Sequence, residues 1–300
     1  MKVIISGASG LLGSALTDAF RAQGDDVWRL VRPGRPLAAQ EIRWDPPSVQ
    51  VDVAGLEGAN AVVHLSGANI SQRRWTPARK QHLRSSRVDS TRVLVDSLAK
   101  LRQPPQVFVC ASAVGYYGNR GDEMLTESSE AGSDFLALLA RDWEAEARRA
   151  QHGGIRTVML RFGVILSSKG GALPQMIRPF KFGVGGPLGS GYQWLSWIAL
   201  EDVVAIVRRA NSDSALRGPV NVVTPNPVRN ADFARIVGRV LHRPAILAAP
   251  PFALRLALGE MADALLLSSQ RAIPQKLLDS KYIFQFSDLE TALRAMLQNS

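Results

Sequence analysis

Short runs of β-branched and other apolar residues alternate with longer segments in which apolar residues recur at helical spacing. After the first run, Leu12, Leu16 and Phe20 share one helical face, and Gly24 follows as a C-terminal cap. Runs of strand length lie at residues 2–6, 26–31, 61–66, 106–111, 156–161 and 219–223. This alternation predicts a parallel sheet with helices on both faces.

Two longer helices are expected between the later strands. Residues 79–101 carry one helical pattern, which Pro104 stops. Residues 135–150 carry the other, with Ser133 as the expected N-cap. In this second helix Glu144 is expected to face solvent.

The chain becomes rich in glycine and proline after about residue 165, and its last fifty residues are mostly helical in pattern. Long irregular segments in compact domains are usually functional covers, and these glycines would let backbone approach a ligand closely. We therefore predict an α/β fold, a Rossmann-type doubly wound parallel sheet with a smaller, mostly helical C-terminal substrate lobe. The sheet domain takes residues 1–165 with a contribution from about 195–225, and the lobe takes 166–195 and 226–300.

Composition narrows the class of protein further. Of 300 residues, 46% are hydrophobic, which is enough for a substantial core. Cys110 is the only cysteine, so no intrachain disulfide can form, and the four histidines show no metal-ligand spacing. The chain has no clean run of about 20 apolar residues and no room for an export signal at its start. We expect a cytoplasmic protein without a metal and without a membrane helix.

The formal charge of +10 does not by itself indicate a nucleic-acid partner. The densest basic cluster runs from Arg73 to Arg87 and lacks the aromatic residues on which single-stranded bases stack. We expect a small-molecule substrate and no nucleic acid, and the sequence leaves a homodimer open.

The strongest motif is VIISGASGLLG at residues 3–13. In a Rossmann unit such glycines make a tight turn, let backbone approach a pyrophosphate and let the helix pack on the strand. A strand before the motif and a helix after it give the context that a nucleotide site requires. The expected cofactor contacts here are Gly7, Ser9, Gly10, Leu11, Leu12 and Gly13.

The end of the second strand indicates which dinucleotide binds. NAD binding usually needs an acidic residue there, but no residue from Val27 to Gln40 is acidic. Arg32 and Arg35 occupy the region instead, and guanidinium groups suit a 2′-phosphate in both charge and geometry. We expect NADP(H) to be preferred over NAD(H).

With these residues in view, the chain resembles the atypical or extended short-chain dehydrogenase/reductases. It is most similar to the epimerase-like group, of NAD-dependent epimerase/dehydratase type, that carries a C-terminal domain of unknown function. The segments that carry the resemblance span the whole chain and include ISGASGLLG, VVHLSGANI, SSRVDSTRVL, ASAVGYYG, DFLALLARDWEAEA and LRFGVILSSKGGAL.

The resemblance implies further residues beside the cofactor. Those implied for the adenosine and pyrophosphate half are Asp45, Leu65, Ser66 and Gly67. Those implied for the nicotinamide half are Arg161 and Gly163. Within the same segments, His64 is favoured as a packed strand residue.

The expected catalytic residues are where the chain departs from the larger superfamily. There, a Ser orients the substrate, and a Tyr four residues before a Lys moves the proton. Ser112 matches the Ser, but Leu136 and Ala140 stand where the Tyr and Lys are expected, and the chain contains no Y-x-x-x-K. Arg87 stands where an Asn is expected.

Three accounts of the chemistry remain open. In the first, Tyr116 or Tyr117 moves the proton, with Arg87 or Arg120 as a nearby cation. In the second, the chemistry is confined to hydride transfer, and substrate or water completes the proton path. In the third, the protein keeps its nucleotide site but is a non-catalytic redox sensor or scaffold.

We therefore expect an NADP(H)-binding oxidoreductase or epimerase that acts on a small metabolite with a hydroxyl or carbonyl group, nucleotide sugars included. The alternative is a non-catalytic NADP(H)-binding sensor or scaffold.

Overall fold

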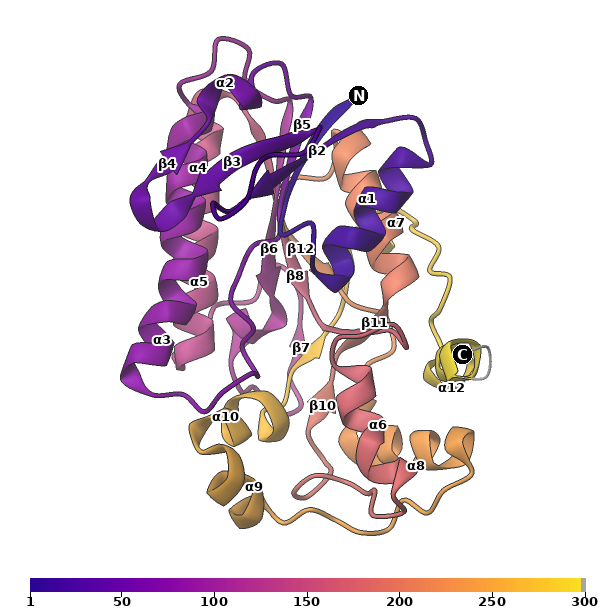
Figure 1. The fold of residues 1–300 in the computed structure, drawn as a ribbon. Coiled ribbons are helices and arrows are strands. Elements are labelled where there is room, and N and C mark those ends of the chain that lie inside the picture. The colour runs from indigo at the N-terminus through magenta and orange to yellow at the C-terminus, as the bar shows by residue number, and fades with distance from the viewer. Residues whose placement is uncertain (298–300) are drawn as a thin grey trace.

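A computed structural model describes residues 1–297, and its centre is an eight-stranded sheet with the order β12-β8-β6-β5-β1-β2-β3-β4 (Figure 1). Its strands are β1 (Lys2–Ser6), β2 (Asp26–Val31), β3 (Glu41–Asp45), β4 (Gln50–Val51), β5 (Ala61–His64), β6 (Val107–Ala113), β8 (Arg156–Phe162) and β12 (Gly218–Val222). Neighbouring strands are parallel, except that the edge strand β4 pairs antiparallel with β3. The sheet confirms the predicted fold class.

Helices cover both faces of the sheet, as the alternating pattern predicted (Figure 1). One face carries α1 (Leu11–Arg21) and α7 (Leu200–Ser212), whose apolar residues pack on the strands. The other face carries α4 (Ser90–Leu98) and α5 (Phe135–Arg148). Full burial of a side chain such as Leu16 or Phe20 contributes about 1.5–3 kcal/mol, so these apolar faces hold the helices in place.

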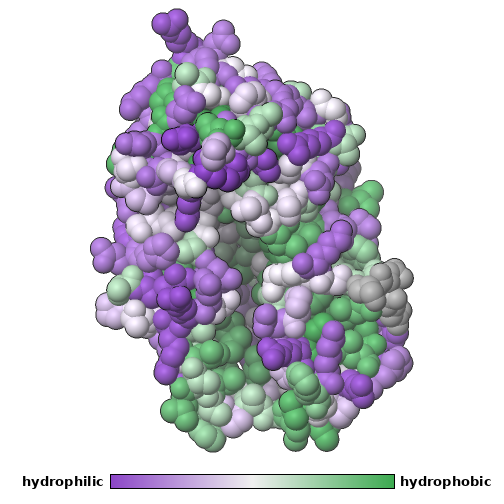
Figure 2. Space-filling view, in the orientation of Figure 1, coloured by the Kyte–Doolittle hydropathy of each residue, from purple (hydrophilic) through white to green (hydrophobic). Residues whose placement is uncertain are grey.

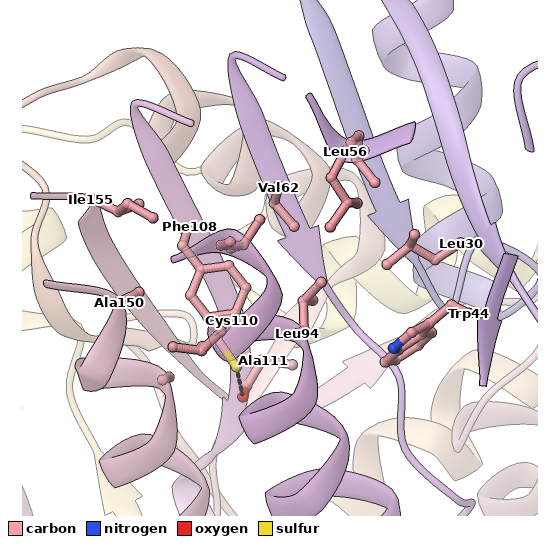
Figure 3. Packing of buried hydrophobic residues seen from close by; sticks show 14 of the residues in the cluster. Leu30, Trp44, Leu56, Val62, Leu94, Phe108, Cys110, Ala111, Ala150 and Ile155 are labelled. Carbon is pink, nitrogen blue, oxygen red and sulfur yellow. Dashed lines mark hydrogen bonds between the residues drawn. The ribbon is translucent and has the colours of Figure 1, made fainter. Parts of the chain in front are cut away.

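Figure 3 shows the packing on the second face. Phe108 and Cys110 of β6 point toward Leu94 of α4, and Trp44 of β3 lies at the far side of the same cluster. Cys110 is fully buried and free, and burial raises the pKa of its thiol. This cysteine is a packing residue.

A smaller part of the molecule lies below the sheet in Figure 1 and is mostly helical. Its helices are α6 (Leu173–Lys181), α8 (Asn230–Leu241), α9 (Pro251–Leu258), α10 (Glu260–Ala262) and α12 (Leu289–Leu297). Short strand pairs link it to the rest, namely β9 (Val164–Leu166) with β11 (Trp197–Ala199), β10 (Trp194–Leu195) with β13 (Val228–Arg229), and β7 (Met124–Leu125) with β14 (Arg271–Ala272). The remaining short helices are α2 (Val53–Leu56), α11 (Gln275–Asp279), η1 (Pro46–Ser48), η3 (Val114–Tyr117), η4 (Arg149–Gly153) and η5 (Asp263–Leu267).

The segment after α11 returns to the sheet-forming part of the chain. Tyr282 and Phe284 pack against the hydrophobic cluster that α1 and α7 share with the sheet. The buried Asp202 carboxylate at the start of α7 accepts the backbone N–H groups of Gln285 (2.8 Å) and Phe286 (3.0 Å). The C-terminal region is therefore tied to the sheet as well as to the smaller helical part.

Two local details differ from the sequence-based expectations. The long helix at residues 79–101 is divided into α3 (Pro77–Arg84), a π-helical turn η2 (Ser85–Asp89) and α4. The N-cap of α5 is Asp134, whose carboxylate accepts the Ala137 N–H at 2.9 Å, so the prediction of Ser133 was wrong by one residue.

Candidate functional site

The glycine loop lies where the order of the strands reverses. From β1 the chain turns to α1 on one face of the sheet, whereas the connection after β5 leads to helices on the other face. Because the connections after these adjacent parallel strands leave to opposite faces, we expect a crevice outside their carboxyl ends. In open α/β sheets this switch point is where ligands bind.

The glycine positions build a close-fitting turn. Gly7 has φ +70°, a region that favours glycine, and a Cβ there would lie 3.0 Å from the Leu65 carbonyl. A Cβ on Gly13 would lie 2.2 Å from the Gly7 oxygen, so only glycine lets α1 approach the strand this closely. Gly10 donates its N–H to the Gly7 oxygen (3.0 Å) and is the N-cap of α1.

The start of α1 is open to a ligand. No side chain caps the helix at Gly10, and Ser9 and Gly10 are exposed. Leu11 and Leu12 are half-buried, and Leu12 packs against the apolar cluster on that face. Backbone N–H groups and the helix dipole at such a terminus favour a phosphate.

Ser6 and His64 fix the second wall of the crevice. The Ser6 hydroxyl accepts the backbone N–H groups of Leu65 (3.0 Å) and Ser66 (3.3 Å), so its own proton points to His64 Nδ1 at 2.7 Å. Burial lowers the pKa of His64 to about 3, and the ring is therefore neutral. His64 is confirmed as a packed strand residue, and its partner Ser6 holds Leu65 and Ser66 against Gly7.

The two arginines after β2 have different surroundings. Arg35 makes a bidentate ion pair with Glu41 of β3, with both N–O distances 2.7 Å, and this hydrogen bonding lowers the pKa of Glu41 to about 2. Arg32 is exposed and forms no ion pair or side-chain hydrogen bond with any of residues 1–297. The two arginines predicted to bind a phosphate therefore differ. Arg35 is already paired with Glu41, whereas the Arg32 guanidinium is available to a ligand.

The residues implied for adenine occupy the end of β3. Asp45 is half-buried and accepts the Ser48 hydroxyl at 2.5 Å. The neighbouring Trp44 is buried and meets the His64 ring edge to face, with 5.5 Å between ring centroids. Trp44 therefore belongs to the core, and Asp45 is the side chain of the two that reaches the surface.

A buried polar network lies beneath the ends of β6 and β8. The Arg161 guanidinium, 1% exposed, pairs with both oxygens of Glu144 at 2.7 and 2.9 Å. The Ser112 hydroxyl donates to the same carboxylate at 2.8 Å. Burial opposes the charge of Arg161, but the hydrogen bonds and charge of Glu144 outweigh it and raise the arginine's pKa.

The expectation that Glu144 faces solvent was wrong. Glu144 follows Ala140 by one helical turn on α5, and Ala140 is buried, so both residues face the sheet. Its partner Arg161 comes from β8, which no pattern within the helix could reveal. The signal in the sequence was the spacing of four residues from Ala140, which puts Glu144 on the same face of the helix.

Tyr117 belongs to the same network. Its hydroxyl lies 3.0 Å from Arg161 Nη1, 2.9 Å from the Thr126 carbonyl and 2.7 Å from the Asn221 amide oxygen. Burial raises the pKa of Tyr117 to about 12, so its hydroxyl stays protonated at neutral pH and is a poor proton donor. Ser112 and Tyr117 are thus both held by protein groups below the crevice.

Tyr116 differs from its neighbour. Its ring stacks on the Arg161 guanidinium, with 3.5 Å from Cζ to the ring centroid, and it is only half-buried. Its hydroxyl makes no hydrogen bond within the part of the chain that the structure describes. Arg120, the cation suggested by sequence spacing, is instead paired with Glu123 at 2.6 Å.

Arg87 is not brought into contact with either tyrosine. Its guanidinium donates to the Ala68 carbonyl (3.0 Å) and lies over the Trp143 ring, 5.4 Å from the centroid. A Cβ on Gly67 would lie 3.1 Å from the Arg87 Cζ, so the guanidinium covers the exposed Gly67.

Several glycines expected near a ligand are explained by packing. A Cβ on Gly163 would lie 2.6 Å from the Ser196 oxygen, and Gly163 donates its N–H to Val222 at 3.1 Å. In the segment after residue 165, a Cβ on Gly186 would lie 2.3 Å from the Leu247 oxygen. At Gly186 the missing side chain therefore serves the close approach of the Leu247 backbone.

Figure 2 shows a recess near the middle of one face, between the sheet part and the smaller helical part, with apolar side chains gathered toward the lower end. Within residues 1–297, no group of three or more His, Cys, Asp or Glu side chains is arranged to hold a metal ion. Over the same range, no helix is both long and apolar enough to cross a bilayer.

Comparison with known proteins identifies the family. Residues 3–222 match the NAD dependent epimerase/dehydratase family, and residues 249–296 match a domain of unknown function, DUF1731. The chain belongs to the NAD dependent epimerase/dehydratase family. It is 46% identical to an epimerase family protein of Mycobacterium bovis over 97% of this chain and 96% of that protein.

Solved structures agree with this membership. Human epimerase family protein SDR39U1 (isoform 2), crystallised with NADPH, superposes with a TM-score of 0.90 at 31% identity, covering 100% of both chains. A nucleoside-diphosphate sugar epimerase of Corynebacterium glutamicum gives 0.84 at 36% identity, and this chain covers 59% of its length. MoeE5, whose structure holds UDP-glucose and NAD, shares the fold at 19% identity with a TM-score of 0.74.

Proposed function

We propose that this protein binds NADPH and is an oxidoreductase or epimerase acting on a small molecule with a hydroxyl or carbonyl group. The observation that carries the proposal is the glycine cradle at the switch point, where Gly7 and Gly13 have no room for a Cβ and α1 begins uncapped. A bound nicotinamide supplies the hydride chemistry, and the protein supplies orientation and proton transfer. The NADPH in the human relative supports this choice of cofactor.

We propose that the cradle of Gly7–Gly13 and the Leu65–Ser66 wall hold the diphosphate, and that Arg32 binds the 2′-phosphate. For the adenosine half we propose Asp45. Arg161 supports the nicotinamide side from below, and Gly163 lets the Ser196 backbone approach closely beneath that side. Among the described residues these groups form one continuous edge, along the carboxyl ends of the strands from β3 to β8.

The Arg32 assignment predicts cofactor preference. In Arg32→Ala we expect NADPH affinity to fall by about tenfold to a hundredfold, because a charge-assisted hydrogen bond contributes roughly 1.5–3 kcal/mol. NADH affinity should stay as in the wild type, and calorimetric titration of both nucleotides measures the two affinities. Arg102→Ala, an exposed arginine in the loop before β6, is the matched control. Equal wild-type affinities for NADPH and NADH would show that Arg32 does not read the 2′-phosphate.

For the proton transfer we propose Tyr116. Unlike the hydroxyls of Ser112 and Tyr117, the Tyr116 hydroxyl has no hydrogen-bond partner among residues 1–297, and the stacked Arg161 guanidinium is a cation beside its ring. A positioned phenol acts as a general acid or base when it lies within hydrogen-bond reach of the substrate oxygen. Arg161 is in turn held by Glu144, so the network positions Tyr116.

A second candidate function is a non-catalytic NADPH sensor or scaffold. It is favoured by Ser112, whose hydroxyl is already bound by Glu144 at the position where relatives in the superfamily orient a substrate. The two functions separate in one screen, in which NADPH-loaded protein meets a panel of small aldehydes and ketones. Loss of NADPH absorbance supports the enzyme. No turnover, with an oligomeric state that changes with the NADP+/NADPH ratio, supports the sensor.

We also propose that residues 1–165 with about 195–225 form the nucleotide-binding domain and that 166–195 and 226–300 form the substrate lobe. The return of Tyr282 and Phe284 to the sheet makes this boundary discontinuous near the C-terminal end. A cytoplasmic location and a homodimer remain proposals from the sequence.

A further inference from the structure

Four cationic side chains lie on and after α3, and they divide into two kinds. Lys80 pairs with Glu260 at 2.5 Å, and Arg84 pairs with Asp142. Arg79 and Arg87 have no carboxylate partner among residues 1–297. The carboxylates that reach α3, Glu260 and Asp142, are thus already paired with Lys80 and Arg84.

Not all N–H groups of the Arg87 guanidinium are used in hydrogen bonds with the described residues. Nη1 donates to the Leu83 carbonyl (3.3 Å) and approaches the Ser86 hydroxyl (3.5 Å), while Nη2 donates to the Ala68 carbonyl (3.0 Å). A guanidinium has five N–H groups, so Nε–H and one N–H of Nη2 have no acceptor within the described chain. Burial, and then the charge of Arg79, lower the pKa of Arg87 to about 10.

Arg79 shows the same deficit. It donates from Nη2 to the Asn69 carbonyl, and its Nε is buried without a hydrogen-bond partner. Two guanidinium groups therefore converge on the loop that follows β5, at Ala68 and Asn69. Holding two cations together, partly out of water, costs free energy unless an anion joins them.

The place of this pair in the fold points to the crevice. Leu65 and Ser66 lie against Gly7 of the cradle, whereas Gly67, the next residue, lies under Arg87. Two residues of extended chain span about 7 Å, so the pair stands beside the proposed cofactor site. Arg87 also projects from a π-helical turn, a feature that recurs at functional sites.

We propose that Arg87 and Arg79 bind an oxyanion, a carboxylate or a phosphate, of the molecule on which the proposed enzyme acts. This rests on the proposed function and names the class of substrate, an anionic hydroxyl or carbonyl compound. The two guanidinium groups receive the anion beside Ala68 and Asn69, whose carbonyls accept hydrogen bonds from them. Arg87 is in this account a substrate-binding residue.

The test uses inorganic phosphate as the probe and protein saturated with NADPH, so that any cofactor phosphate sites are filled. Calorimetric titration should show saturable phosphate binding to the wild type. Arg87→Gln should weaken it by at least about tenfold, because a charge-assisted hydrogen bond is lost. Arg79→Gln should weaken it as well, and Arg84→Gln should leave it unchanged because Asp142 already neutralises that arginine.

The remaining outcomes separate the alternatives. Phosphate that binds all four proteins equally, or does not bind the NADPH-loaded wild type, overturns the proposal. Phosphate that competes with NADPH assigns the oxyanion to the cofactor and overturns the substrate class. If Arg87→Gln does not fold, Arg79→Gln decides. Failure of NADPH itself to bind contradicts the proposed function separately, and phosphate titration of the free protein then still tests the two arginines.

Discussion

Replacing Glu144 with alanine should lower the free energy of unfolding by about 3–5 kcal/mol, because breaking a buried ion pair leaves an uncompensated charge. Arg161 is 1% exposed, and Glu144 accepts two of its N–H groups and the Ser112 hydroxyl. Alanine removes these three hydrogen bonds, together with a fourth from the half-exposed Arg148 at 3.2 Å, and leaves the Arg161 guanidinium without its counter-charge. Urea unfolding of the wild type and the variant measures the difference.

The matched control is Glu146→Ala on the same helix. Glu146 pairs with Arg92 and Arg149, whose side chains are 46% and 43% exposed, so we expect a cost of no more than about 1 kcal/mol. Glu144→Gln, which keeps hydrogen-bonding capacity but removes the charge, should fall between the two alanine variants. A Glu144→Ala protein as stable as Glu146→Ala would mean that water or another group takes over the pairing of Arg161.

The features that the sequence predicted well are those with local signals. Strand-length apolar runs and one amphipathic helical pattern predicted the sheet and its covering helices, because the periodicity of apolar residues can be recognised within each segment alone. Gly7 and Gly13 were recognised because the strand before them and the helix after them are adjacent in the chain. Their roles in the structure, a positive φ and a close helix approach, are those that the spacing implies.

What the sequence missed depends on partners far along the chain. Glu144 was placed in solvent because its counter-ion, Arg161, comes from a different strand. Arg35 was expected at a phosphate, and its ion pair with Glu41, which follows Gln40 directly, was not foreseen. In both cases the partner of a charged side chain is decided by the tertiary structure, because an ion pair contributes little free energy until the fold shields it from water.

Tyr116→Phe should reduce kcat by about a hundredfold or more, because positioned general acid–base catalysis contributes roughly 10²–10⁴-fold. Phenylalanine keeps the ring that stacks on Arg161 and removes only the hydroxyl, so stability and NADPH affinity should stay near those of the wild type. The measurement is the rate of NADPH loss with whichever carbonyl compound turns over fastest in the screen.

Tyr117→Phe is the control variant for the loss of a tyrosine hydroxyl. Its hydroxyl bonds to Arg161, Thr126 and Asn221, so its loss should lower stability by about 1–3 kcal/mol because buried polar partners are left unsatisfied. Turnover at a temperature where this variant is folded should fall far less than in Tyr116→Phe. If Tyr116→Phe turns over at the wild-type rate, the proton comes from water or from the substrate itself. The stacked Arg161 would then serve only to hold the tyrosine ring in the wall of the site.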